Sequence, residues 1–264
     1  MHLGIGGFLV VLLLSWLSGT NLFSLLGTGG DSPAPSQTVG TTGAVRASPA
    51  EERNVDMVDA VANDVQDTWA KLLGSRYART HVVLFRDAFQ SGCGTAQSAM
   101  GPFYCPEDHK VYLDLEFFSE LSRKFGAPGD FAEAYVIAHE FGHHVQNLLG
   151  LDRRAAGDRR TGANSASVAL ELQADCFAGV WGHAASQNGQ IRAGHVKLDP
   201  GDAEAALHAA SSIGDDRLQK MATGRVMPDR FTHGTSAQRV ESFGRGMESG
   251  DPRVCGAPAS AMTH

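Results

Sequence analysis

The chain has 264 residues, of which 42% are hydrophobic and 19% are charged, so it is long and apolar enough to form one large globular domain. Its formal net charge is -7, and no run of Lys or Arg is longer than two residues. These features exclude the extended basic surface that binds DNA or RNA. We therefore expect no nucleic-acid partner.

An uncharged, apolar segment opens the chain. No charged residue occurs between residues 3 and 30, and residues 5–26 are long enough to span a hydrocarbon core about 30 Å thick. The apolar stretch continues beyond Asn21 and no cationic residue precedes it, which favours an uncleaved anchor over a cleaved signal peptide. We predict a membrane anchor at residues 1–27 of a single-pass membrane protein with an extracytoplasmic domain. Secretion after signal cleavage is the alternative.

The folded domain is predicted at residues 48–264. Before it, residues 28–47 are rich in Gly, Ser, Thr and Pro and nearly lack large apolar side chains, so we expect a flexible linker. Ser48, Pro49 and Glu51 then have the pattern of a capped helix start. Apolar residues at helical spacing follow, so the first helix should pack one face on the domain.

Two short runs with β-strand character follow at residues 81–85 and 110–114. In the second run, Tyr112 should face away from Val111 and Leu113, because successive strand residues alternate. If this strand lies at the edge of the sheet, it can pair with an extended peptide. An ordinary buried strand is the alternative.

Four cysteines suggest two disulfides in a chain that begins with an export-type segment. Cys93 and Cys105 flank a loop rich in Gly, Ser and Thr, which favours their pairing and leaves Cys176 with Cys255. Three connectivities are nevertheless possible for four cysteines. Four reduced thiols are the alternative.

Residues 130–149 are predicted to form a helix, preceded by a short helix at residues 115–125. Apolar residues recur at spacings of three and four, Asp130 suits the N-cap, and Gly150 suits the C-terminal stop. One face of this helix should therefore be buried.

The same helix contains the pattern H-E-x-x-H, which is typical of a zinc site. His139 and His143 lie one turn apart on one stripe, so both imidazoles can reach a single Zn²⁺ ion. Glu140 points beside that ion, where a carboxylate can act as the base for a metal-bound water.

A catalytic zinc site usually has three protein ligands. The metzincin spacing is excluded, because a third histidine would have to stand where this chain has Leu149. The next predicted helix, which begins after Asn164 or Ser165, carries Glu171 as the candidate third ligand. One turn further on, Asp175 can accept the outer N–H of a ligand histidine, with His139 as the expected partner.

The rest of the chain is predicted to be largely helical. Residues 151–164 form a polar connection, and further helices are predicted at residues 202–212 and 236–248. Just before the last helix, His233 is a candidate donor to a developing oxyanion, with a capping or packing role as the alternative. The element order predicts an α+β fold, in which a small, mainly antiparallel sheet packs on the zinc-binding helix.

H-E-x-x-H followed by E-x-x-x-D resembles the gluzincin metallopeptidases. Longer strings resemble the bacterial putative neutral zinc metallopeptidase family. They are residues 91–94 (Ser-Gly-Cys-Gly), 101–106, 111–114, 138–146, 171–181 and 233–239 (His-Gly-Thr-Ser-Ala-Gln-Arg). The resemblance covers about residues 50–255 and implies a zincin-like peptidase domain behind one N-terminal membrane segment.

From these features we expect a membrane-anchored zinc endopeptidase that holds one Zn²⁺ ion and cleaves a peptide or protein substrate. Glu140 would be the general base. A deformylase-like hydrolase, with Cys93 as a ligand in place of Glu171, is one alternative. A zinc-bearing scaffold domain without turnover is the other.

Overall fold

A computed structural model describes residues 49–97, 101–114, 117, 130–155, 158, 160–187, 202–212 and 214–262. The predicted anchor, the linker and Ser48 lie outside these residues, as does all but one residue of the short helix predicted at 115–125. The proposed division at residues 27 and 47 therefore stays a prediction.

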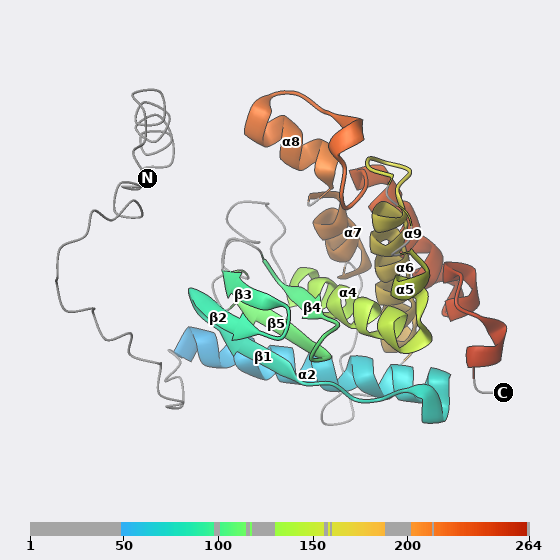
Figure 1. The fold of residues 1–264 in the computed structure, drawn as a ribbon. Coiled ribbons are helices and arrows are strands. Elements are labelled where there is room, and N and C mark those ends of the chain that lie inside the picture. Colours follow the sequence, from blue (N-terminus) through green and yellow to red (C-terminus); the bar gives the residue numbers. More distant parts are fainter. Residues whose placement is uncertain are drawn as a thin grey trace, which may run out of the picture. The chain divides into compact units, whose positions relative to one another are not determined.

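The described part of the chain is α+β and mostly helical, as the element order predicts (Figure 1). In chain order its α-helices are α2 (Pro49–Leu73), α4 (Asp130–Leu149), α5 (Leu151–Ala155), α6 (Ala166–Gln187), α7 (Asp202–Ser212), α8 (Asp215–Thr223) and α9 (Ser236–Ser249). Its 3-10 helices are η2 (Gly74–Arg76), η4 (Pro228–Arg230), η5 (Pro252–Cys255) and η6 (Ala259–Ala261). Its strands are β1 (Val82–Phe85), β2 (Ala88–Ser91), β3 (Gly94–Gln97), β4 (Phe103–Cys105) and β5 (Lys110–Asp114).

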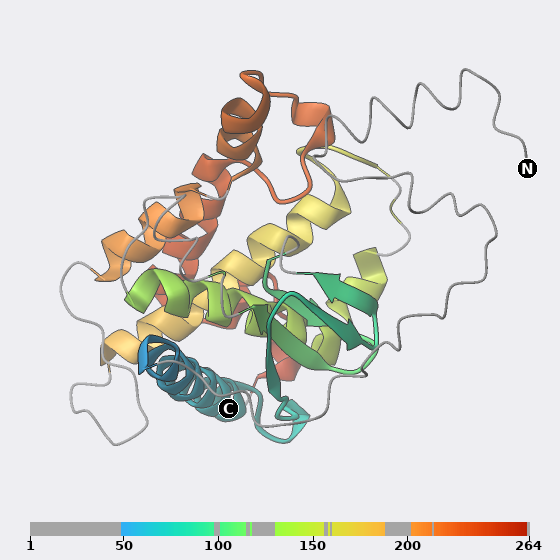
Figure 2. The same ribbon diagram turned by 90° about the vertical axis from the view of Figure 1, so that its left-hand side faces the viewer.

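Helix α4 is the central element of this folded unit. It packs against α2, α6 and α7, and it also contacts β4 and β5. Figure 2 shows α2 nearly end-on beside the sheet, with α4 and α6 crossing next to it. Helix α6 makes its most extensive contact with α9. The H-E-x-x-H residues therefore lie on a helix that is enclosed by other elements.

The larger sheet is mixed, which corrects the prediction of a mainly antiparallel one. Its strand order is β1-β5-β4, with β1 parallel and β4 antiparallel to β5, while β2 and β3 form a separate hairpin. The reason is that β4 reverses into β5 and returns the chain to the direction of β1. Strand β5 thus has β1 along one side and β4 beside residues 110–112 on the other, so of the two alternatives it is the ordinary buried strand and not an edge strand.

One hydrophobic core joins α2, α4, α6, α7, α9 and β5. In it the ring of Trp69 meets Phe177 edge to face, with centroids 5.2 Å apart. Val111 and Leu113 face this core, whereas Tyr112 packs with a smaller cluster on the other side of the sheet. The predicted alternation along β5 is therefore confirmed.

Side-chain caps define the helix ends near the predicted positions. The Ser165 hydroxyl accepts the N–H of Val168 at 3.2 Å and starts α6. Thr235 and Gln238 form a reciprocal capping box at the start of α9. Gly150 has φ of 67°, which suits a glycine directly after α4. Helix α8 was not predicted, because its sequence is polar on average and Leu218 and Met221 are its only large apolar residues.

Two disulfides are present, and they join the predicted pairs. Cys93 is bonded to Cys105, which ties the turn after β2 to β4. Cys176 is bonded to Cys255, which ties the middle of α6 to the end of η5. None of the cysteines is free.

Among the helices of the described ranges, none combines the length and the apolar character that a bilayer crossing requires. The apolar residues of these helices are instead used in the shared core. This finding contradicts the prediction of a single-pass membrane protein, which we do not carry further. The segment behind that prediction, residues 3–30, lies outside the described residues.

Candidate metal centre

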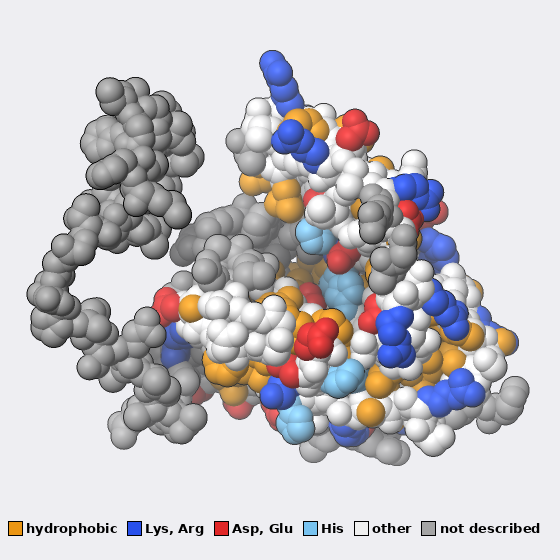
Figure 3. Space-filling view, viewed as in Figure 1, with side chains coloured by type: hydrophobic (Ala, Val, Ile, Leu, Met, Phe, Trp, Pro, Cys, Tyr) orange, Lys and Arg blue, Asp and Glu red, His pale blue; other side chains and the backbone are white. Residues whose placement is uncertain are grey.

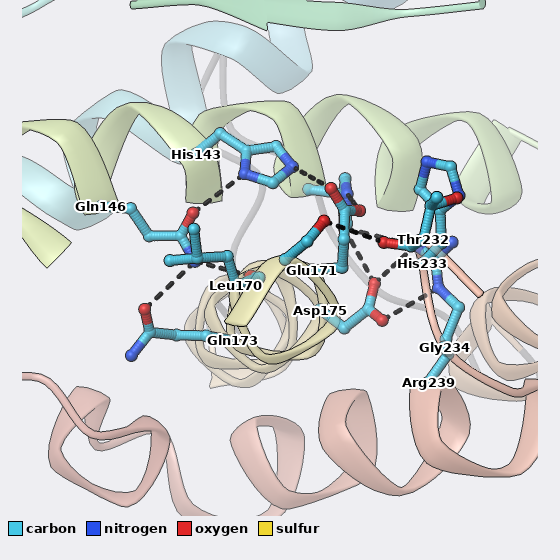
Figure 4. Close-up of polar contacts among 12 residues, drawn as sticks. His143, Gln146, Leu170, Glu171, Gln173, Asp175, Thr232, His233, Gly234 and Arg239 are labelled. Atoms are coloured by element: carbon cyan, nitrogen blue, oxygen red, sulfur yellow. Dashed lines mark hydrogen bonds and ion pairs between the residues drawn. The ribbon is translucent and has the colours of Figure 1, made fainter. Parts of the chain in front are cut away.

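Helices α4 and α6 bring two histidines and one glutamate together. His139 Nε2 lies 3.3 Å from one carboxylate oxygen of Glu171, and His143 Nε2 lies 3.5 Å from the other. One ligand atom from each of the three residues fits within 4.8 Å of the others. The predicted ligand set is therefore gathered at one point, which lies between α4 and α6 (Figure 4).

A glycine within the H-E-x-x-H motif permits this close approach. A Cβ atom at Gly142 would lie 2.9 Å from the carbonyl oxygen of Ala174, so a side chain there would push α6 away. Gly142 stands directly before His143, and Ala174 lies between Glu171 and Asp175. The close contact of α4 with α6 at Gly142 and Ala174 therefore brings the ligand side chains of the two helices within reach of one another.

The donor set suits zinc. Two imidazole nitrogens and one carboxylate make up a common catalytic zinc site, with a fourth position open to water. The Nδ1 atoms of His139 and His143 already have protein partners, so each ring turns its Nε2 atom toward Glu171. These residues therefore fit a single divalent ion.

An ionic cluster, fully buried, holds His139. Its Nδ1 lies 2.8 Å from Oδ1 of Asp175, and the Tyr135 hydroxyl donates to the same oxygen at 2.6 Å. Arg239 donates to both oxygens of Asp175, from Nε at 2.9 Å and from Nη2 at 2.8 Å. Asp175 is 0% exposed and Arg239 is 3% exposed. The predicted partner of His139 is in place, and it is held in turn by a buried guanidinium.

The pKa values in this cluster follow from burial and charge. Burial alone would raise the pKa of Asp175, but the charges of Arg239 and His139 outweigh it and hold the pKa below its ordinary value. Burial lowers the pKa of His139, while the Asp175 charge and hydrogen bonds to Asp175 and Glu171 raise it more, to about 10. Without metal, His139 is therefore protonated on both ring nitrogens, and an incoming ion must displace the proton on Nε2.

Neutral amides hold His143. Its Nδ1 lies 2.9 Å from Oε1 of Gln146, whose amide nitrogen donates to the Leu170 carbonyl at 2.6 Å and to Oε1 of Gln173 at 3.1 Å. Figure 4 shows these contacts running from His143 toward Gln173. The His143 side chain is 22% exposed, against 8% for His139.

The carboxylate of Glu171 is ionised in this setting. Burial tends to raise its pKa, but the nearby charges of His143 and His139, and a hydrogen bond from His139, lower it well below its usual range. Glu140 follows His139 on α4 and is 6% exposed. Its role as the base of the H-E-x-x-H pattern stays a prediction.

His233 lies on the loop before α9, and Asp215 shapes that loop. Oδ2 of Asp215 accepts the backbone N–H groups of Thr232, His233 and Gly234 at 2.7, 2.6 and 3.1 Å. The side chain of His233 is 49% exposed. The hydrogen bond with Asp215 raises the pKa of His233, burial lowers it, and the charge of Glu171 raises it further. His233 thus stays accessible and within electrostatic reach of Glu171.

The structure rules out one alternative ligand and places one further histidine. Cys93 is locked in a disulfide with Cys105, so it offers no thiolate, and the deformylase-like alternative loses its ligand. His144, which follows His143 on α4, is 1% exposed, with Nε2 2.7 Å from the Ala78 carbonyl and Nδ1 3.1 Å from the Tyr104 hydroxyl. These contacts join α4 to β4 and to the segment before β1.

Three residues of the centre were not predicted: Arg239, Tyr135 and Gln146. Arg239 belongs to the string at residues 233–239 that supports the family resemblance, so its identity was noted without a role. Tyr135 lies one turn before His139 on α4, a spacing that could have suggested contact. For Gln146 only its place three residues after His143 gave a signal.

Figure 3 shows histidine side chains in a hollow on the face seen in Figure 1, with acidic side chains beside them. Helix α8 lies above this hollow in the view, and α4 lies behind it (Figure 1). The side chains of His143 and His233 are 22% and 49% exposed, so this part of the centre is open to solvent.

Comparison with known proteins agrees with this geometry. Residues 2–257 match the model of a family described as putative neutral zinc metallopeptidase. The chain is 45% identical over 262 residues to the Uncharacterized protein YpfJ of Escherichia coli K12, which covers 96% of this chain and 86% of the relative. It is 48% identical over 202 residues to the Uncharacterized protein Rv2575 of Mycobacterium tuberculosis H37Rv, which covers 75% of this chain and 68% of the relative. No solved structure matches. The chain belongs to the putative neutral zinc metallopeptidase family.

Proposed function

We propose that this protein is a zinc-dependent endopeptidase of the gluzincin type, with one Zn²⁺ ion held by His139, His143 and Glu171. The observation that supports this most directly is the convergence of the two Nε2 atoms on the Glu171 carboxylate. The family membership supports the same activity. The partner would be a peptide or protein substrate.

When bound, zinc would supply Lewis-acid chemistry, which lowers the pKa of water and polarises a carbonyl group. Glu140 would take the proton from the attacking water on its carboxylate and deliver it to the leaving amine. Asp175 and Gln146 would hold the two imidazoles with their Nε2 atoms toward the metal position.

His233 would stabilise the oxyanion that develops on the scissile carbonyl. Its raised pKa favours the protonated, donating form, and Asp215 holds its loop through three backbone hydrogen bonds. His233→Gln should lower kcat about 10²- to 10³-fold with a smaller change in KM. His208→Gln, on the exposed side of α7, is the control. Unchanged turnover in the His233 variant would remove this residue from the mechanism.

The main test is cleavage of casein or a quenched-fluorescence peptide by the purified protein. A chelator should abolish cleavage and added Zn²⁺ should restore it. Glu140→Gln should keep the bound zinc and lose about 10²- to 10⁴-fold in kcat, because a general base contributes that much. Glu248→Gln, an exposed glutamate on α9, should be fully active. Full peptidase activity in a zinc-loaded Glu140→Gln variant would refute the assignment.

A third outcome distinguishes the scaffold alternative. Wild-type protein that binds zinc through Glu171, loses it in Glu171→Ala, and cleaves neither casein nor peptides would have a metal-bearing domain without turnover. The metal assignment would then stand while the endopeptidase proposal failed.

A further inference from the structure

A continuous hydrogen-bond relay connects His143 to the C-terminal part of the chain. His143 Nδ1 lies 2.9 Å from Oε1 of Gln146, and the Gln146 amide donates to Oε1 of Gln173 at 3.1 Å. The Gln173 amide then donates to the backbone carbonyl of Cys255 at 2.7 Å. The relay therefore crosses from α4 through α6 to η5.

The carbonyl at its end fixes the direction of every bond in the relay. A backbone carbonyl only accepts, so Gln173 must turn its NH₂ group to Cys255 and its oxygen to Gln146. Gln146 must then turn its own oxygen to His143, an orientation that its second bond to the Leu170 carbonyl also requires. His143 is left with a proton on Nδ1 and a free lone pair on Nε2, which is the form that binds a metal.

Two features hold the Cys255 carbonyl in place. The disulfide from Cys255 to Cys176 ties η5 to α6, three residues beyond Gln173. Directly after Cys255, Gly256 has φ of 84°, and a Cβ atom there would come within 3.3 Å of the Gln173 amide nitrogen. The chain thus turns tightly around the end of the Gln173 side chain.

We propose that the segment Pro252–Cys255, held by the Cys176–Cys255 disulfide, is a positioning element of the metal centre. It acts through Gln173 and Gln146, which are positioning residues and not ligands, and it holds His143 in the tautomer that binds metal. This inference rests on the proposed function only in taking His143 as a zinc ligand. It predicts that the C-terminal disulfide controls how tightly zinc is held.

The second disulfide of the chain is a matched control. The Cys93–Cys105 bond joins the turn after β2 to β4, on the sheet. Both bonds are native to the same chain, and only the Cys176–Cys255 bond holds a carbonyl that ends the relay.

The first experiment measures the zinc dissociation constant by competition with a chromophoric chelator. Cys176→Ala/Cys255→Ala should bind zinc about tenfold more weakly, at the lower end of the 10- to 100-fold loss typical of outer ligand partners. Cys93→Ala/Cys105→Ala should bind as the wild type does. Equal affinity in the two double variants would overturn the proposal. Circular dichroism at the assay temperature checks that each variant is folded.

A second pair of variants leaves both disulfides intact. Gln173→Met removes the amide link and should weaken zinc binding by a similar factor. The control is Gln66→Met, which removes a buried glutamine on α2 whose side-chain oxygen accepts the Thr80 N–H at 2.8 Å. This variant should bind zinc as the wild type does. If the relay carries the effect, adding Gln173→Met to the Cys176/Cys255 double variant should cost little more. Full additivity would show that the two act separately and would contradict the relay.

A spectroscopic readout needs neither metal nor activity. In the metal-free protein at alkaline pH, two-bond ¹H–¹⁵N spectra should show His143 with its proton on Nδ1, and Gln173→Met should increase the Nε2-protonated form. An unchanged tautomer in that variant would overturn the proposal. If wild-type protein binds zinc tightly but cleaves nothing, only the proposed peptidase function fails. If it binds zinc and the variants match it, only this inference fails.

Discussion

His139 and His143 both turn Nε2 toward Glu171, but their Nδ1 atoms are bound by different kinds of acceptor. On the His139 side the acceptor is a carboxylate, Asp175, compensated by Arg239. On the His143 side the acceptor is the neutral amide of Gln146. The first ring is nearly buried and the second is about one-fifth exposed.

The difference shows which partners a hydrogen-bond acceptor needs when it is buried. A buried carboxylate is costly unless another charge and further hydrogen bonds compensate it, and Asp175 receives both. Once assembled, such a cluster cannot lose one member cheaply. The amide side carries no net charge, so the loss of one link there should be milder.

The largest effect should come from removing the buried guanidinium. Arg239→Met leaves the buried Asp175 carboxylate with His139 as its one charged partner, so we expect a loss of about 3–5 kcal/mol in the free energy of unfolding. Urea denaturation of the metal-free protein measures it. Arg245→Met, an exposed arginine on the same helix, should change stability by no more than about 0.5 kcal/mol.

A double variant tests whether charge is the cause. Asp175→Asn in the Arg239→Met background removes the carboxylate that lost its guanidinium partner, so part of the lost stability should return. If the double variant is as unstable as the sum of the two single variants, the two side chains do not act as an ion pair.

The next effect concerns how α9 comes close enough for Arg239 to reach Asp175. Glycines let α6 and α9 touch: a Cβ atom at Gly246 would lie 1.9 Å from the carbonyl oxygen of Cys176. Gly246→Ala should therefore cost about 3 kcal/mol in the free energy of unfolding. At Gly244 on the same helix a Cβ atom meets nothing within 4 Å, so Gly244→Ala should raise stability by about 0.5–1 kcal/mol. Thermal unfolding of both variants measures the two changes. If Gly246→Ala is no less stable than Gly244→Ala, the contact between α6 and α9 is not tight.

The sequence predicts those residues of the centre that lie close together along the chain. His139, His143 and Glu140 follow from helical spacing alone, and the E-x-x-x-D spacing on the next helix added Glu171 and Asp175. Repeating patterns within one helix carry that information. The bounds of α4 and α9 and the start of α6 were predictable for the same reason, because caps and apolar stripes are local.

Arg239 could not be reached in this way. It meets Asp175 across 64 residues, and only the packing of α6 on α9 brings the two together. The parallel pairing of β1 with β5 has a similar cause, since strand order depends on how the disulfide-bonded loop folds back. Contacts between distant segments need the assembled core, which no local spacing specifies.

A smaller effect should follow from placing a charge on the amide side. Gln146→Glu removes the two donated hydrogen bonds and points a carboxylate at the Leu170 carbonyl and Gln173 Oε1. At pH 7 we expect a loss of about 2 kcal/mol in the free energy of unfolding, because carboxylate oxygens would face other acceptors. Gln146→Met, which brings no acceptor, should lose less. The gap between the two variants should close near pH 5, where a protonated Glu can donate. A Glu variant that equals the wild type in urea denaturation would mean that either kind of acceptor serves at His143.

The smallest effect is the pH dependence of stability in the metal-free protein. The lowered pKa values of the carboxyl groups limit stability on the acid side, and the raised pKa of His139 limits it on the alkaline side. Asp175 and Glu171 have pKa values below their ordinary 3.8 and 4.5, so their contribution is present above these values and is lost as pH falls. The pKa of His139 is raised from 6.5 to about 10, so its contribution is complete below 6.5 and is lost as pH rises toward 10. Stability to urea should peak between about pH 4.5 and 6.5, and zinc, which replaces the His139 proton, should remove the alkaline decline. Gln146→Met should keep that decline, since it alters only the amide side. A midpoint that rises steadily from pH 6.5 to 9 without metal would show that His139 is not held by its ionic partners.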